Sequence, residues 1–257
     1  MLSWVRFQVL REQTTIRSWK QLKTATINEA LNTLTRMDSR KYKNEDKWAI
    51  KNKIIIDIAT HMIKNDRNFE SVLNTIAKGY GGSFDKGIET RGQIRTNKED
   101  KTMVTLYNPT AYSEYAKKFY EYHKKVPNRI SPFENMELTQ LNAIDKTCGI
   151  MQHPKKEFII PALKHANESY NKIVDALKAQ RYLTPETEKE IAKLHFIITN
   201  ALPFSRGTAG IANLLTRSLY KAFGIVLPAT RENVSLDLEA FCNSLEEYQK
   251  NWKNYFE

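Results

Sequence analysis

The sequence predicts a mainly α-helical protein with one small β-hairpin, on three observations. Helix-start signals recur along the chain, with a capping box at Thr26–Glu29 and cap-plus-proline starts at Asn108-Pro109 and Thr184-Pro185. Strand character is confined to residues 88–107, where a polar turn interrupts it. Apolar side chains recur at helical spacing from 235 to 256, which predicts a C-terminal helix that packs back on the core.

The elements follow in order from these signals. Asn44 precedes a predicted helix that runs through Met62, and Asp66 or Ser71 starts a short helix that ends at Gly79. The hairpin over 88–107 comes next, and a long loop is the alternative for that segment. The change in character after residue 80 divides the chain into a basic helical region, 1–80, and a helical core, 81–257.

The second half also reads as consecutive helices. Asn108-Pro109 supplies the cap and first-turn proline of a helix rich in tyrosine. Ser131-Pro132 predicts a second such start, and Thr184-Pro185 predicts a third. Between them, a helix over 155–180 contains Pro161, which is expected to interrupt it.

The bulk composition is that of an ordinary globular protein with an excess of positive charge. The 257 residues carry a formal net charge of +11, and 41% of them are hydrophobic. No apolar run approaches the roughly 20 residues of a membrane span, and Arg6 and Arg11 interrupt the start too often for a secretory signal. We therefore expect folding in a cytosol, and delivery into a host cell by a signal-independent system stays open.

Cysteine and histidine give no metal-site pattern. Cys148 and Cys242 lie far apart in the sequence, which favours two free thiols over a structural disulfide. None of the five histidines is paired at a spacing that places two ligands on one helix face, so no metal site is expected. His195 lies in an apolar helix, where a hydrogen-bonded core histidine is favoured over a catalytic one.

Basic residues are densest in the first quarter of the chain. Such a cluster attracts nucleic acid, anionic lipid or an acidic protein surface, and the alternative is a solvated helix face. If nucleic acid is the partner, Lys41, Lys43 and Lys47 are the expected contacts. The cluster consists of Arg36, Arg40, Lys41, Lys43, Lys47, Lys51 and Lys53.

Residues 190–215 combine a helix, a tight loop and a second helix that opens on glycines. Free N–H groups and the positive dipole end make such a helix start a seat for phosphate. Gly207, Thr208 and Gly210 would donate backbone N–H groups there, and Arg206 would clamp the anion. Turn geometry alone is the alternative explanation, because many helix connections carry proline and glycine without binding a ligand.

This stretch resembles a degenerate Fic motif, whose usual pattern is His-Pro-Phe-x-Asp-Gly-Asn-Gly-Arg before a leucine-rich helix. The framework matches at Pro203, Phe204, Gly207, the pair Leu214-Leu215 and Gly224. The resemblance covers roughly residues 88–226. It implies a Fic-like, or Fido, helical bundle in which the hairpin at 88–107 is the flap that aligns a target segment.

The departures from the motif bear on the chemistry. Leu202 stands where the family has its catalytic histidine and cannot act as a general base. Arg206 replaces the metal-binding aspartate, so Mg²⁺ is not required, and Thr208 and Gly210 replace the asparagine and the arginine. Effectors of the AvrB type share this wider fold without the usual motif, which implies a different transfer chemistry.

Three functions stay open at this stage. The first is a bacterial effector that binds a nucleotide or nucleotide-sugar and acts as a nucleotidyl- or glycosyl-transferase on a protein target, of the host or of the bacterium. Its phosphate-binding residues are Arg206, Gly207, Thr208 and Gly210, with Arg91, Arg95 and Arg217 as further anion contacts. The second is a pseudoenzyme scaffold that binds a partner protein, and the third is a basic helical protein that associates with nucleic acid.

Overall fold

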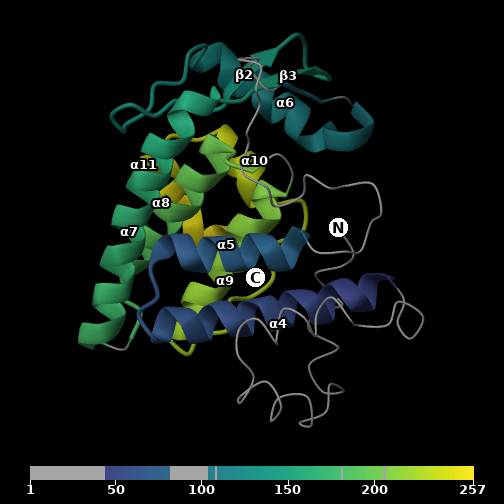
Figure 1. Cartoon of the computed structure of the whole chain (residues 1–257). Coiled ribbons are helices and arrows are strands. Elements are labelled where there is room, and N and C mark those ends of the chain that lie inside the picture. Colours follow the sequence, from purple (N-terminus) through teal and green to yellow (C-terminus); the bar gives the residue numbers. More distant parts are fainter. Residues whose placement is uncertain (1–43, 82–103, 108, 181, 205–206) are drawn as a thin grey trace.

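The computed structural model describes residues 44–81, 104–107, 109–180, 182–204 and 207–257. A helical bundle forms one layer, and a small sheet with one helix forms a second layer at its end (Figure 1). The mainly α-helical prediction with a small sheet is confirmed. The capping box at Thr26–Glu29, the first 43 residues and most of the 88–107 segment lie outside the described residues.

The bundle contains α4 (Asn44–Lys64), α5 (Phe69–Gly81), α7 (Ile159–Gln180), α8 (Pro185–Ala201), α9 (Thr208–Ala222), α11 (Leu245–Asn251) and the 3₁₀ turn η2 (Trp252–Tyr255). The sheet layer contains β1 (Val104–Tyr107), α6 (Pro109–Lys125), β2 (Gln140–Ala143) and β3 (Gly149–Gln152). The 3₁₀ turn η1 (Lys156–Phe158) leads into α7, and the short α10 (Leu236–Phe241) lies between the layers.

Helix α8 is the centre of the bundle. Every residue from Leu194 to Ala201 is buried, so this helix contacts neighbours all round rather than along one stripe. Thr184 caps its start by accepting a hydrogen bond from the N–H of Thr187, with Pro185 in the first turn, as the sequence predicted. The large apolar core gathers around this helix from α4, α5, α7, α9 and the C-terminal segment.

The sheet is antiparallel with strand order β1-β3-β2. Val104 and Gln140 both lie opposite Gln152, one on each side of β3. A second, smaller apolar core joins the sheet to α6 and α10 through Phe119, Leu141, Met151 and Phe241. The described end of the predicted hairpin segment therefore pairs with β3, a strand that the sequence reading did not include.

Arg129 fastens the sheet layer to the bundle. Only 6% of its surface is exposed. Its Nη1 donates to the carbonyl of Thr139 and to Oδ1 of Asn200, at 2.6 and 2.7 Å. Its Nη2 donates to the carbonyls of Ala240 and Asn243, at 2.8 and 3.1 Å. One guanidinium thus joins the start of β2, the end of α8 and the end of α10.

Two sequence predictions of helix limits are wrong. No helix starts at Ser131, because its Oγ accepts a local hydrogen bond from the N–H of Phe133 and Asn135 then adopts a left-handed backbone with φ 52°. The C-terminal helix over 235–256 is divided, because Ser244 and Glu247 form a capping box that starts α11 anew.

Other helix limits agree with the sequence or shift slightly. Helix α4 is described from Asn44, a residue that the sequence placed before the helix, and it ends at Lys64, just past the predicted Met62. Helix α5 begins at Phe69, between the two predicted starts, and extends to Gly81. Pro161 does not interrupt α7, since it lies in the first turn, where N–H groups have no intrahelical acceptor. Cys148 and Cys242 are free thiols, as expected.

The basic cluster is in part a core feature. Lys51 in α4 is 2% exposed, and its Nζ donates to the carbonyl of Tyr80 at 3.3 Å. Long lysine stems pack well against apolar surface while the ammonium finds an acceptor. Lys51 is thus removed from the solvent-facing patch that the sequence suggested.

We predict that Arg129→Lys lowers the free energy of unfolding by about 2 to 4 kcal/mol, because an ammonium cannot reproduce the forked contacts and leaves buried carbonyls unsatisfied. Urea unfolding followed by circular dichroism measures the change. Lys124→Met, at an exposed lysine of the same segment, is the control and should change stability by less than about 0.5 kcal/mol. Equal stability of Arg129→Lys and the native protein would contradict this assignment.

Candidate functional site at the junction of the two layers

The loop between α8 and α9 is held by its own polar groups. Leu202 ends α8 in a left-handed conformation with φ 45°, and Gly207 precedes α9 with φ 86°. The hydroxyl of Thr208 lies 3.3 Å from both the N–H and the carbonyl oxygen of Phe204. Gly207 is therefore required by backbone conformation, and the Thr208 hydroxyl serves the turn.

Gly210 allows a close approach of the preceding bundle helix. A Cβ built at this position would overlap the ring of Tyr80, which comes from α5. The ring therefore covers the first turn of α9 on the side of Gly210. Gly207, Thr208 and Gly210 lie together at the start of α9, as the sequence predicted, and the packing of Tyr80 gives the glycine a structural role beside any phosphate contact.

The arginines of the predicted anion site are not gathered there. Arg217 lies nine residues beyond Thr208, which is about 14 Å along the helix. Its Nη1 and Nη2 donate to the carbonyls of Leu227 and Pro228, at 2.8 and 3.1 Å. Burial lowers the pKa of Arg217 to about 10. Arg206, Arg91 and Arg95 lie outside the described residues.

His195 is a packed core residue, as the sequence favoured. Its Nε2 lies 3.0 Å from Oδ1 of Asn213, and its Nδ1 lies 2.9 Å from the hydroxyl of Tyr248. Burial lowers the pKa of the imidazole to about 4, so the ring is neutral at physiological pH. A neutral ring donates one hydrogen bond to the amide oxygen and accepts one from the tyrosine.

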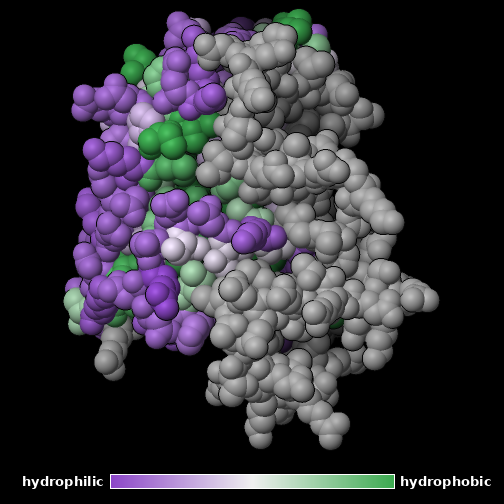
Figure 2. Space-filling model, viewed as in Figure 1, coloured by the Kyte–Doolittle hydropathy of each residue, from purple (hydrophilic) through white to green (hydrophobic). Residues whose placement is uncertain are grey.

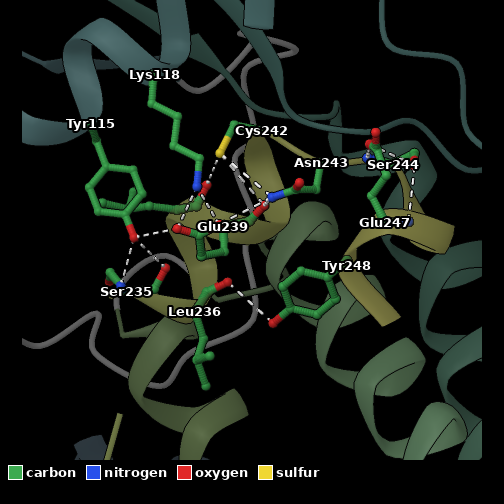
Figure 3. Close-up of polar contacts among 11 residues, drawn as sticks. Tyr115, Lys118, Ser235, Leu236, Glu239, Cys242, Asn243, Ser244, Glu247 and Tyr248 are labelled. Carbon is green, nitrogen blue, oxygen red and sulfur yellow. Dashed lines mark hydrogen bonds and ion pairs between the residues drawn. The ribbon is translucent and has the colours of Figure 1, made fainter. Parts of the chain in front are cut away.

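A polar cluster lies where α6 meets α10 (Figure 3). The carboxylate of Glu239 accepts from the Tyr115 hydroxyl at 2.8 Å and from Nζ of Lys118 at 2.7 Å. The Tyr115 hydroxyl in turn accepts from the N–H of Ser235 at 2.9 Å. Burial is the main cause that raises the pKa of Tyr115, so the phenol stays protonated as a donor.

Asp237 is a partly buried carboxyl of α10 that the sequence analysis did not single out. The hydroxyl of Ser235 donates to its Oδ1 at 2.6 Å. Burial raises the pKa of this carboxyl, against the lowering effect of that bond and of the N–H groups at the start of α10. Among the described residues, no lysine or arginine forms an ion pair with it. The sequence does show a Ser-x-Asp pattern at Ser235 and Asp237, but this pattern is typical of ordinary helix capping and does not indicate a functional carboxyl.

Glu239, the other carboxylate of α10, has different surroundings from Asp237. Glu239 is compensated by Lys118, at 2.5 Å from Oε2, whereas Asp237 has a hydroxyl partner and, among the residues that the structure describes, no cation. Two carboxyls with such different surroundings can have different roles: Glu239 a structural role in an ion pair, and Asp237 a role in proton transfer. Cys242, at the end of α10, is inert by contrast, because burial raises its pKa to about 12.

A cleft of about 1220 Å³ opens beside this cluster, between α6 and α11. Lys118, Cys242 and Asn243 form its wall on the side of Glu239. Within the described part of the chain, no cluster of histidine, cysteine and acidic side chains could hold a metal ion, and no helix is long and apolar enough to cross a membrane.

Comparison with known proteins gives the class of this chain. The family model of the AvrB and AvrC avirulence proteins matches residues 108–257, which include α6, the sheet strands β2 and β3, and the helices α7 to α11. The chain therefore belongs to the AvrB/AvrC family of avirulence proteins.

One curated relative resembles part of the chain. Avirulence protein B of Pseudomonas savastanoi pv. glycinea is 29% identical over 96 residues, which are 37% of this chain. The match spans 29% of that relative's length.

We predict a pH dependence of stability from His195. Because its folded pKa lies below the ordinary value of 6.5, at about 4, the unfolded chain binds the proton more readily in this window. Stability should fall as the pH drops from 6.5 to 4, by about 3 kcal/mol in total. Urea unfolding at each pH measures it, and His195→Gln should flatten this part of the profile; an unchanged profile would contradict it.

We also predict that Gly210→Ala lowers the free energy of unfolding by about 1 to 3 kcal/mol, because the new methyl group meets the Tyr80 ring. In a Tyr80→Ala background the same substitution should be neutral or stabilising, since alanine is the better helix former. Thermal unfolding of the four proteins measures the coupling. Equal costs of Gly210→Ala in both backgrounds would show that Tyr80 is not the obstacle.

Proposed function

We propose that this protein is an effector that enters a host cell and transfers part of a nucleotide or nucleotide-sugar to a hydroxyl group of a host protein. The observation that carries the proposal is Asp237, a carboxyl of raised pKa at the junction of the two layers, with a hydroxyl partner and no cation among the described residues. Membership in a family of avirulence proteins supports a target in the host.

Asp237 supplies the function that Leu202 cannot. A carboxylate whose pKa is raised towards neutrality accepts a proton from an attacking hydroxyl more readily than an ordinary aspartate does. In the proposed step, the acceptor oxygen forms a bond to the donor carbon or phosphorus, the bond to the leaving phosphate breaks, and the proton passes to Asp237. The hydrogen bond from Ser235 fixes the carboxyl group for this role.

The start of α9 is the proposed seat of the donor phosphates. Gly207, Thr208 and Gly210 begin that helix, whose free N–H groups favour an anion, and Arg206 would add a fixed charge without a metal ion. Arg91 and Arg95 stay proposed contacts from the flap segment. Arg217 would reach an anion only after leaving the carbonyls of Leu227 and Pro228.

A catalytically inactive scaffold is the second candidate, and the position of Tyr80 favours it. The ring packs against Gly210, where a phosphate would otherwise approach the first turn of α9. If the ring stays there in solution, the protein acts by binding a partner and the degenerate motif is only structural.

We predict that Asp237→Asn abolishes donor turnover without abolishing donor binding. The protein is incubated with ATP, GTP and UDP-sugars, ³¹P NMR follows release of the leaving phosphate to water, and a thermal-shift assay reports binding. Loss of a general base should lower the rate about 10²- to 10⁴-fold. Asp175→Asn, at an exposed aspartate of α7, is the matched control and should keep the native rate.

Two results would contradict the proposal. An unchanged rate in Asp237→Asn removes the general base. The absence of a thermal shift with every donor, in native protein and in Arg206→Ala alike, leaves no donor site and supports the scaffold.

A further inference from the structure

The first turn of α10 is held by side chains from other elements rather than by a cap of its own. The helix has only six residues, and its N-cap, Ser235, makes no side-chain capping bond, since its hydroxyl donates to Oδ1 of Asp237 instead. So short a helix gains little stability from its own hydrogen bonds. The direction of the Asp237 side chain, two residues after the N-cap, therefore depends on tertiary contacts to this turn.

Two tyrosine hydroxyls contact this turn, one from each layer (Figure 3). From α6 in the sheet layer, the Tyr115 hydroxyl accepts from the N–H of Ser235 at 2.9 Å. From α11 in the bundle, the Tyr248 hydroxyl lies 3.2 Å from the carbonyl oxygen of Leu236. Both hydroxyls meet backbone atoms, so together they fix the place of the turn itself.

Tyr115 has two polar partners, and they depend on it to different degrees. Glu239 accepts from the phenol, but it also accepts from Nζ of Lys118 at 2.7 Å and from Nδ2 of Asn243 at 3.2 Å. The N–H of Ser235, by contrast, has the phenol as its acceptor. Loss of the Tyr115 hydroxyl would therefore leave Glu239 paired and would release the residue whose own hydroxyl holds the reactive carboxyl.

We propose that Tyr115 is a positioning residue for Asp237, which acts through the N–H of Ser235 and keeps the carboxyl in its place at the junction of the layers. The inference rests on the proposed function, in which Asp237 is the general base. Tyr115 touches no reacting atom in that scheme. A base displaced by about 1 Å can lose about 10²-fold in rate, so a hydroxyl that fixes the backbone beside it affects the chemistry.

The remaining titratable groups of the cluster keep one state near neutral pH. Burial raises the pKa of Tyr115, of Cys242 and of Tyr248, so these three groups stay protonated. Lys118 and Glu239 form an ion pair with each other. A change in the pKa of Asp237 on loss of the Tyr115 hydroxyl therefore reports the surroundings of the carboxyl itself.

Tyr115→Phe tests the proposal, because it removes the hydroxyl and keeps the buried ring, whose centroid lies 5.7 Å from that of Phe119. The first measurement is ¹³C NMR titration of the Asp237 carboxyl. Burial is the largest cause of its raised pKa, so a loosened turn that admits water should lower that pKa. In the donor-turnover assay, kcat should fall about ten- to hundredfold at unchanged KM, and the acid limb of its pH profile should move to lower pH.

Two further variants of α6 are the controls. Tyr120→Phe removes a phenol hydroxyl from the same helix, at a residue whose ring lies beside Nζ of Lys124, and should behave as the native protein does. Lys118→Met removes the cation beside Glu239 and keeps the Tyr115 hydroxyl. Because loss of a nearby positive charge disfavours a carboxylate, this variant should leave the pKa of Asp237 unchanged or raise it.

An unchanged or raised pKa of Asp237 in Tyr115→Phe overturns the proposal. An equal fall of that pKa in Lys118→Met also overturns it, because the integrity of the whole cluster, and not the hydroxyl, is then the cause. The titration needs no turnover, so the two proposals fail separately. A native protein that turns over no donor contradicts the proposed function, while the titration still decides whether Tyr115 positions Asp237.

Discussion

The placement of α10 between the two layers depends on the buried guanidinium of Arg129. Its four hydrogen bonds reach the carbonyls of Thr139, Ala240 and Asn243 and the amide of Asn200. Thr139 extends the joint, since its hydroxyl donates to the carbonyl of Asn200 and contacts Nδ1 of His153. A short helix of six residues has little stability by itself, so these contacts decide where its side chains lie.

The chemistry of the junction follows from that placement. Because α10 is held under α6, Glu239 meets both Tyr115 and Lys118, while Asp237, two residues earlier in the same helix, keeps only a hydroxyl partner among the described side chains. The described part of the surface in Figure 2 is mostly hydrophilic, and small apolar areas lie between its hydrophilic residues. The two layers therefore bring together groups from 115 to 239 that the sequence keeps far apart.

Some of this arrangement was predictable from sequence. The helix start at Thr184-Pro185, the free cysteines and the core character of His195 depend on local patterns, which can be recognised without knowing the fold. The sheet strands β2 and β3 were missed because each has only four residues of ordinary composition. They form strands because they pair with each other, which is a tertiary contact. Asp237 was missed because its raised pKa comes from tertiary burial, which no spacing encodes.

The degenerate motif is a second case in which the sequence alone does not decide what a residue does. The sequence order predicts that Gly207 and Gly210 belong to a phosphate seat. The structure gives each glycine a structural reason, because Gly207 has a left-handed backbone and Gly210 lies against the ring of Tyr80. Residue order alone cannot separate these roles. The family membership, by contrast, rests on the matched length of chain and not on the motif.

The central claim, that the junction holds a reactive carboxyl, is tested most directly by ¹³C NMR titration of the Asp237 side chain in the native protein. The account predicts a pKa above the ordinary aspartate value, because burial outweighs the hydrogen bonds that favour the charged form. A pKa at or below the ordinary value would mean that the hydrogen bonds at the start of α10 dominate, and Asp237 would then be a helix-capping residue with no reactive role.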